Sequence, residues 1–145
     1  MRRGMARVGV AAALLAAMWG CDTGPSAPTP VDNTIDPATP AYYTHNVKPI
    51  FQKYCYRCHA GLNHRGGLTM ATRAGLMKGG ETGKDIVPGD PQASVMMRLI
   101  RHEPGPAKGP GPMPSKSSKL ADQDIDTVGR WIAAGAVMPQ DGPVP

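Results

Sequence analysis

Two cysteines and a histidine stand close together in the run Cys55-Tyr56-Arg57-Cys58-His59. The pattern C-x-x-C-H is the signature of covalent haem attachment. On a helix, two cysteines three positions apart share one side, so each thiol can form a thioether with one vinyl group of the same porphyrin. The adjacent histidine then projects toward the iron. We therefore predict one covalently bound haem c, attached through Cys55 and Cys58, with His59 as an iron ligand.

Three other uses of such a cysteine pair are weaker here. A disulfide across two intervening residues closes a short loop and adds little stability. A thioredoxin-like redox pair needs a βαβ unit, and no segment of this sequence alternates apolar and polar residues as a strand does. A zinc site needs a second pair of cysteines or histidines at metal spacing, which is lacking.

A second iron ligand must come from among nine methionines and the other histidines. Met113 lies in a loop stiffened by proline on both sides and free of other large side chains, so its sulfur can approach an iron; the alternative is an exposed loop methionine. Met96 and Met97 lie in a predicted helix and are assigned to core packing. The remaining histidines lack a patterned context: His45, His64 and His102. Of these, His102 is the alternative ligand.

Apolar side chains recur with helical spacing around these residues. Helices are expected from a start between Asn46 and Pro49 into the motif, and over about 72–78, 90–101 and 122–134. Residues 103–118 are expected to form a loop, and no sheet is expected. Gly129 lies inside the last predicted helix, where glycine costs about 1 kcal/mol relative to alanine, and this indicates a close approach by another helix.

The composition suits a core that is partly cofactor. The 145 residues are enough for one ordinary domain, and 18 Gly and 16 Pro predict long loops. One Phe, two Trp and four Tyr are few for a self-sufficient core. A porphyrin would supply the missing apolar surface.

The first twenty-one residues have the pattern of an export signal: a basic start, an apolar run and the exit Gly20-Cys21. The apolar run is shorter than the roughly 20 residues that span a bilayer. Gly20-Cys21 resembles the lipobox of bacterial lipoproteins, which implies a lipid on Cys21; an ordinary secreted protein is the alternative. We expect an exported protein, lipid-anchored on the periplasmic side of a membrane.

The chain is expected to divide into a signal peptide (1–20), a lipid-anchored proline-rich linker (21–40), a folded domain (41–138) and a flexible tail (139–145). The formal net charge is +5, but three of the basic residues lie in the predicted signal peptide. No basic cluster interleaved with aromatics follows, so nucleic acid is not an expected partner.

The order of the C-x-x-C-H helix, a Met113-Pro114 loop and a closing helix with Trp131 resembles small class I cytochromes c over about 41–138. Residues 85–91 and 131–136 are similar to a cytochrome c domain of exported bacterial proteins. The resemblance implies an all-α fold of about four helices around one haem, with the first and last helices crossing beside it. It also implies His59 as proximal and Met113 as distal ligand. Residues 60–68 lack the proline that mitochondrial-type members place near the carbonyl orienting the proximal histidine.

A haem with both axial positions filled has no site for a substrate, so its chemistry is electron transfer. We expect a membrane-tethered monohaem carrier that passes single electrons between exported or membrane redox partner proteins, and not an enzyme. One alternative is a haem enzyme such as a peroxidase with an open distal site, for which His102 and Glu103 would be the acid–base groups. The other is a non-catalytic haem sensor or interaction module.

Overall fold

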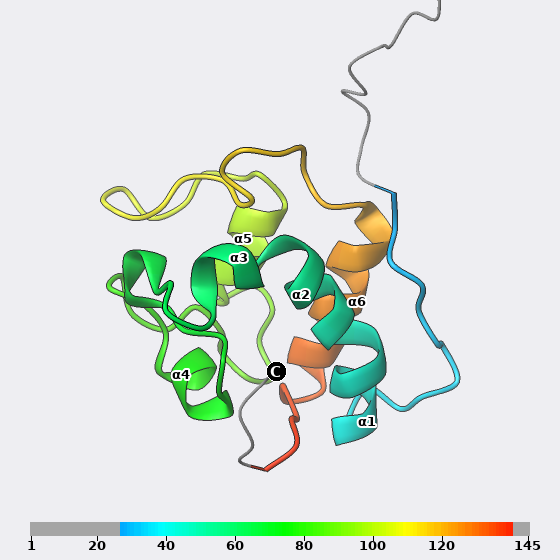
Figure 1. The fold of residues 1–145 in the computed structure, drawn as a ribbon. Helices are drawn as coiled ribbons and strands as arrows, with labels where there is room; N and C mark the ends of the chain where they lie inside the picture. Colours follow the sequence, from blue (N-terminus) through cyan, green and yellow to red (C-terminus); the bar gives the residue numbers. More distant parts are fainter. Residues whose placement is uncertain (1–26, 141–145) are drawn as a thin grey trace, which may run out of the picture.

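A computed structural model describes residues 27–140, and this part of the chain is helical (Figure 1). The elements are α1 (Pro40–Tyr42), the π-helical turn η1 (Tyr43–Val47), α2 (Lys48–Tyr54), α3 (Tyr56–His59), the 3-10 turn η2 (Arg65–Gly67), α4 (Arg73–Lys78), α5 (Val95–Ile100) and α6 (Asp122–Ala133). Within residues 27–140 there is no strand, only an isolated bridge between Gly80 and Gly83. The expected all-α fold is confirmed.

The predicted signal peptide, Cys21 and the end of the predicted tail lie outside the described residues. Among the helices of residues 27–140, none is both long enough and apolar enough to cross a membrane.

α1, η1 and α2 form one continuous helical run that leads into the motif (Figure 1). The run begins at Pro40, where the Thr39 side chain accepts a hydrogen bond from the backbone N–H of Tyr42. The expected start between Asn46 and Pro49 is therefore wrong. Pro49 lies in the first turn of α2, directly after the π-helical turn, where its missing N–H costs least.

The core lies between this run and α6, which also packs against α5. Val47, Ile50 and Phe51 are buried on the inner face of the run, and Tyr54, with the same helical spacing, is half-buried. The fully buried Trp131 of α6 packs against two aromatic rings, with centroids 5.4 Å from Tyr43 and 5.9 Å from Phe51. The apolar face of α6 is buried as well: Ile125, Val128 and Ile132.

α4 and α6 match their predicted ranges closely, whereas α5 is shorter than predicted. Asp90 starts a turn and not the helix, because its Oδ1 accepts hydrogen bonds from the N–H groups of Gln92 and Ala93, each at 2.9 Å. The buried Ser94 hydroxyl then donates to the carbonyl of Asp90 at 2.8 Å, and the helix begins only at Val95.

Gly129 marks the contact between α6 and α5. A Cβ atom there would lie 3.3 Å from Cε of Met97, which projects from α5. The predicted close approach of another helix at Gly129 therefore comes from α5. α6 also packs against η1, so the first helical run and the last helix are in contact as well.

Residues 27–36, which we call the N-terminal strap, lie along the helical unit, so this part of the expected 21–40 linker is bound to the domain (Figure 1). The fully buried carboxylate of Asp124 accepts hydrogen bonds from the Thr29 N–H at 2.8 Å and from its hydroxyl at 3.3 Å. The fully buried Asn46 amide bonds the Asp32 N–H at 2.8 Å and its carbonyl at 2.9 Å. Hydrogen bonds to buried polar side chains thus hold the strap, and its low content of apolar residues does not predict this contact.

Replacing Asp124 by alanine is expected to release the strap. The change leaves the Thr29 N–H and hydroxyl without their acceptor, at a cost of about 1–3 kcal/mol. Limited proteolysis should then cleave within the strap faster than in the unmodified protein. Asp122→Ala is the matched control, because Asp122 is an exposed carboxylate in the same helical turn. Equal cleavage of the two variants would contradict the anchoring role.

Candidate haem-binding site

The end of the first helical run and α3 bring the motif residues into one turn. The Cys55 carbonyl accepts hydrogen bonds from the N–H groups of Cys58 and His59, each at 3.0 Å. Both cysteines are half-buried free thiols. The three side chains that the sequence predicts to act together therefore lie together in the structure.

Burial sets the protonation states of this turn. Burial raises the pKa of the Cys55 thiol to about 12, and the neighbouring Cys58 adds to the increase. Burial also lowers the pKa of His59, with the backbone groups of Leu68 and Arg65 acting in the opposite direction. A neutral imidazole is favoured, which is the form that binds a metal.

His59 borders two cavities of about 280 and 290 Å³. The first, which we call the loop cavity, is bounded by Gly66, Gly80 and Asp85. The second, which we call the cysteine cavity, is bounded by Cys55 and Cys58 and by the apolar Ile100 and Leu120. Three residues line both: His59, Arg65 and Met113.

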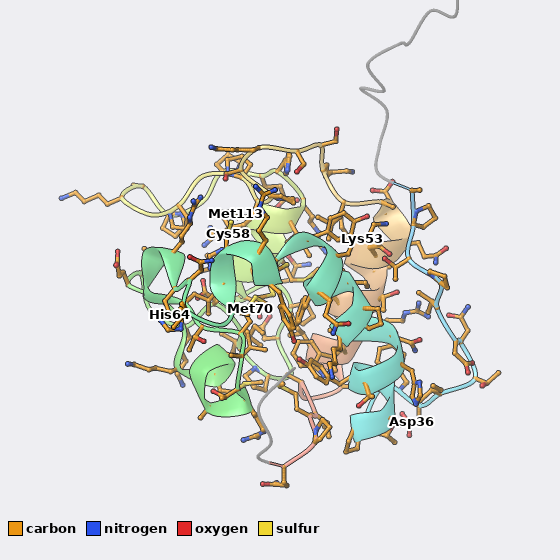
Figure 2. All side chains as sticks on the ribbon, viewed as in Figure 1. Asp36, Lys53, Cys58, His64, Met70 and Met113 are labelled. Carbon is orange, nitrogen blue, oxygen red and sulfur yellow. The ribbon has the colours of Figure 1, made fainter. Side chains whose placement is uncertain are left out.

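Met113 reaches this place because its loop is attached to α5. Its backbone N–H donates to the carbonyl of Leu99 at 2.9 Å, and its half-buried side chain lines both cavities. Figure 2 shows Met113 and Cys58 close to each other, in agreement with their shared cavity. The structure thus brings Met113 and His59 to the same two cavities.

The other candidate ligands lie elsewhere. Met96 and Met97 are buried in the core, as predicted. His45 and His64 are exposed, and Figure 2 shows His64 on the loop beyond the motif. His102 lines neither cavity, and its Nε2 is buried and finds no hydrogen-bond partner in the described part of the chain.

The charged residues of the loop cavity are not singled out by the sequence: Arg65, Glu81, Asp85 and Lys108. Arg65, Glu81 and Asp85 come together because the glycine loops at 66–67 and 79–80 touch, and Lys108 comes from the loop of residues 103–118. A Cβ atom at Gly80 would lie only 2.5 Å from the Gly66 carbonyl oxygen, so this approach requires glycine. Asp85 accepts a hydrogen bond from the Gly80 N–H at 2.9 Å, and burial raises the pKa of its carboxyl. Paired glycines are the only local signal for this arrangement.

The residues present fit a c-type haem. Two thiols, an imidazole and a thioether are the donors that such a haem uses when both axial positions are filled. Nδ1 of His59 is buried and, within residues 27–140, has no hydrogen-bond partner, so the ring is desolvated before any metal binds. Both cavities are lined by His59 and Met113, so there is space beside each of the two side chains.

A protein-family model described as Planctomycete cytochrome C matches residues 55–107, a stretch that begins at the first cysteine of the motif. Searches of curated proteins and of solved structures give no significant match. The family match, the helical fold and the placement of the motif together support a c-type cytochrome domain in this chain, and such a domain implies haem c.

Proposed function

We propose that this protein is an exported, lipid-anchored monohaem electron carrier of the class I cytochrome c type. It passes single electrons between exported or membrane-bound redox partner proteins. The observation that carries the proposal is that His59 and Met113 line the same two cavities, one of which also exposes Cys55 and Cys58. A haem held there supplies a one-electron ferric/ferrous couple.

The four residues have separate tasks in this proposal. Cys55 and Cys58 would attach the group covalently, while His59 and Met113 would hold its iron. The neutral Met113 thioether favours ferrous over ferric iron and raises the reduction potential.

Absorption spectra of the oxidised and reduced protein, with and without carbon monoxide, test the carrier against a haem enzyme. With both axial positions filled by protein side chains, the reduced protein should bind no carbon monoxide and turn over no peroxide. Ready binding of carbon monoxide, or useful peroxide reduction, would replace the carrier with an enzyme. Rapid reduction by a membrane or exported redox protein distinguishes a carrier from a non-catalytic sensor.

Cys21→Ser tests the anchor. The variant is expected to move from the membrane fraction to the soluble exported fraction, because the serine hydroxyl cannot accept the thioether-linked lipid. Fractionation followed by detection of the protein measures the change. Unchanged membrane association would remove the lipid anchor from the proposal and leave the electron carrier in place.

A further inference from the structure

The mouth of the cysteine cavity carries basic side chains and no acidic ones. Its charged lining residues are Lys53, Arg57, Arg65 and Lys116. All four are exposed, and within residues 27–140 none of them forms an ion pair. We call these four residues the cationic face. Charges of one sign around a cavity create a local field that attracts anions.

The described chain begins beside this same face. The Lys53 ammonium group and the Tyr54 hydroxyl donate to the carbonyl of Ala27 at 2.8 and 3.2 Å, and both side chains line the cysteine cavity. Asp124 and Asn46 then hold the strap farther along. Figure 1 shows the first described residues on the same side of the molecule as the loop of residues 103–118, which carries Met113.

The distance from this point to the predicted anchor is short. Cys21 precedes Ala27 by six positions, and an extended chain spans at most about 3.5 Å per residue, so the reach is roughly 20 Å. A lipid on Cys21 would hold the cationic face close to the bilayer. Lysine and arginine side chains near a bilayer surface are attracted to anionic lipid headgroups.

We propose that the cationic face docks on anionic phospholipid headgroups, so that the cysteine cavity faces the bilayer surface. The strap fixes this orientation because it holds Ala27, from which the chain leads to the anchor at Cys21, beside the cationic face. The side of the protein with the cysteine cavity would then exchange electrons with a redox partner in the same membrane. The orientation rests on the lipid anchor of the proposed function, whereas headgroup binding by the cationic face requires neither the lipid nor an assigned iron ligand.

Headgroup binding is tested with full-length Cys21→Ser protein and sedimentable vesicles. Vesicles containing phosphatidylglycerol should bind the protein, and vesicles of phosphatidylcholine alone should not. Added salt should weaken the binding. Lys53→Gln, Arg57→Gln and Lys116→Gln combined should lower the affinity by on the order of 100-fold.

The matched control removes the same charge from exposed positions that line neither cavity: Arg73→Gln, Lys78→Gln and Lys84→Gln. This variant should retain most of the affinity. Equal loss in both triple variants would show attraction by net charge alone and would overturn the proposal. Failure of the Cys21→Ser protein to bind anionic vesicles would also overturn it, in favour of an acidic protein partner.

Orientation is tested with the lipidated, haem-loaded protein in vesicles. In this form all three native cysteines of the protein are covalently occupied, Cys21 by lipid and Cys55 and Cys58 by haem, so none of them reacts with a spin label. A spin label at Ser115→Cys, in the lining of the cysteine cavity, is compared with one at Lys78→Cys on α4. Nickel-chelating lipid should broaden the signal of the Ser115→Cys label far more than that of the Lys78→Cys label. Equal or reversed broadening would contradict the proposed orientation.

Discussion

Met113→Ala is expected to remove the weak long-wavelength sulfur-to-iron band of the oxidised protein and to let the reduced protein bind carbon monoxide. Both changes follow from loss of the Met113 thioether, since no other methionine of residues 27–140 lines the two cavities beside His59. The reduction potential should fall by on the order of 100 mV, because axial ligands tune haem potentials over a range of about 0.8 V. Absorption spectroscopy and redox titration measure these effects.

Met96→Ala is the control for this substitution. Met96 is buried in α5 and lines neither cavity, so its truncation should cost roughly 2–5 kcal/mol of stability and leave the spectrum intact. If Met113→Ala kept the sulfur-to-iron band and the potential, Met113 would not be the axial ligand. His102 would then be the remaining candidate, although it borders neither cavity.

The last helix was predictable because its local signals agree with one another. Asp122 and Asp124 occupy its first turn, apolar residues recur on one face, and Gly135, with φ of 99°, follows its end. The first helix shows the opposite situation. Thr39-Pro40 and Asn46 with Pro49 offer competing start signals, and the tertiary structure uses Asn46 to hold Asp32. Local pattern cannot decide between two such signals.

The N-terminal strap shows what composition alone misses. Its contact between Thr29 and Asp124 joins residues 95 positions apart, and it is made by hydrogen bonds and not by apolar burial. Asp124 carries two signals at once, because a carboxylate in the first turn of a helix already has a local explanation. Its second role, as an acceptor for a distant segment, has no trace in its sequence neighbourhood.

The candidate site also contains both residues that a local sequence pattern predicts and residues whose position depends on tertiary contacts. Cys55, Cys58 and His59 form a local pattern whose geometry one helical turn dictates. Met113 was predicted as a ligand because its loop is stiffened by proline and free of other large side chains. Its position beside His59, however, depends on the hydrogen bond to Leu99. Arg65 could not have been foreseen, because it lines the cavities only after two glycine loops have closed on each other.

Combined replacement of Cys55 and Cys58 by alanine is expected to abolish covalent haem attachment. The unmodified protein should exceed its peptide mass by one haem, and this haem should stay with the chain in acidified organic solvent. The double variant has no thiol near His59 to form a thioether, so any haem it binds should be extracted completely. Either single variant retains one thiol and should hold haem through a single bond, which resists the same extraction.

Cys21→Ser is the matched control, since it removes the remaining cysteine and should retain one covalent haem per chain. Without haem, the cavities beside His59 lose the apolar surface that this aromatic-poor core needs, so the double variant should unfold at lower temperature than the control. Haem that stays with the double variant through extraction, or an unmodified protein whose mass equals that of the peptide, would mean that the two thiols serve another chemistry. Because Cys55 and Cys58 are free thiols bordering one cavity, that chemistry would then be sought in their redox or metal-binding reactions.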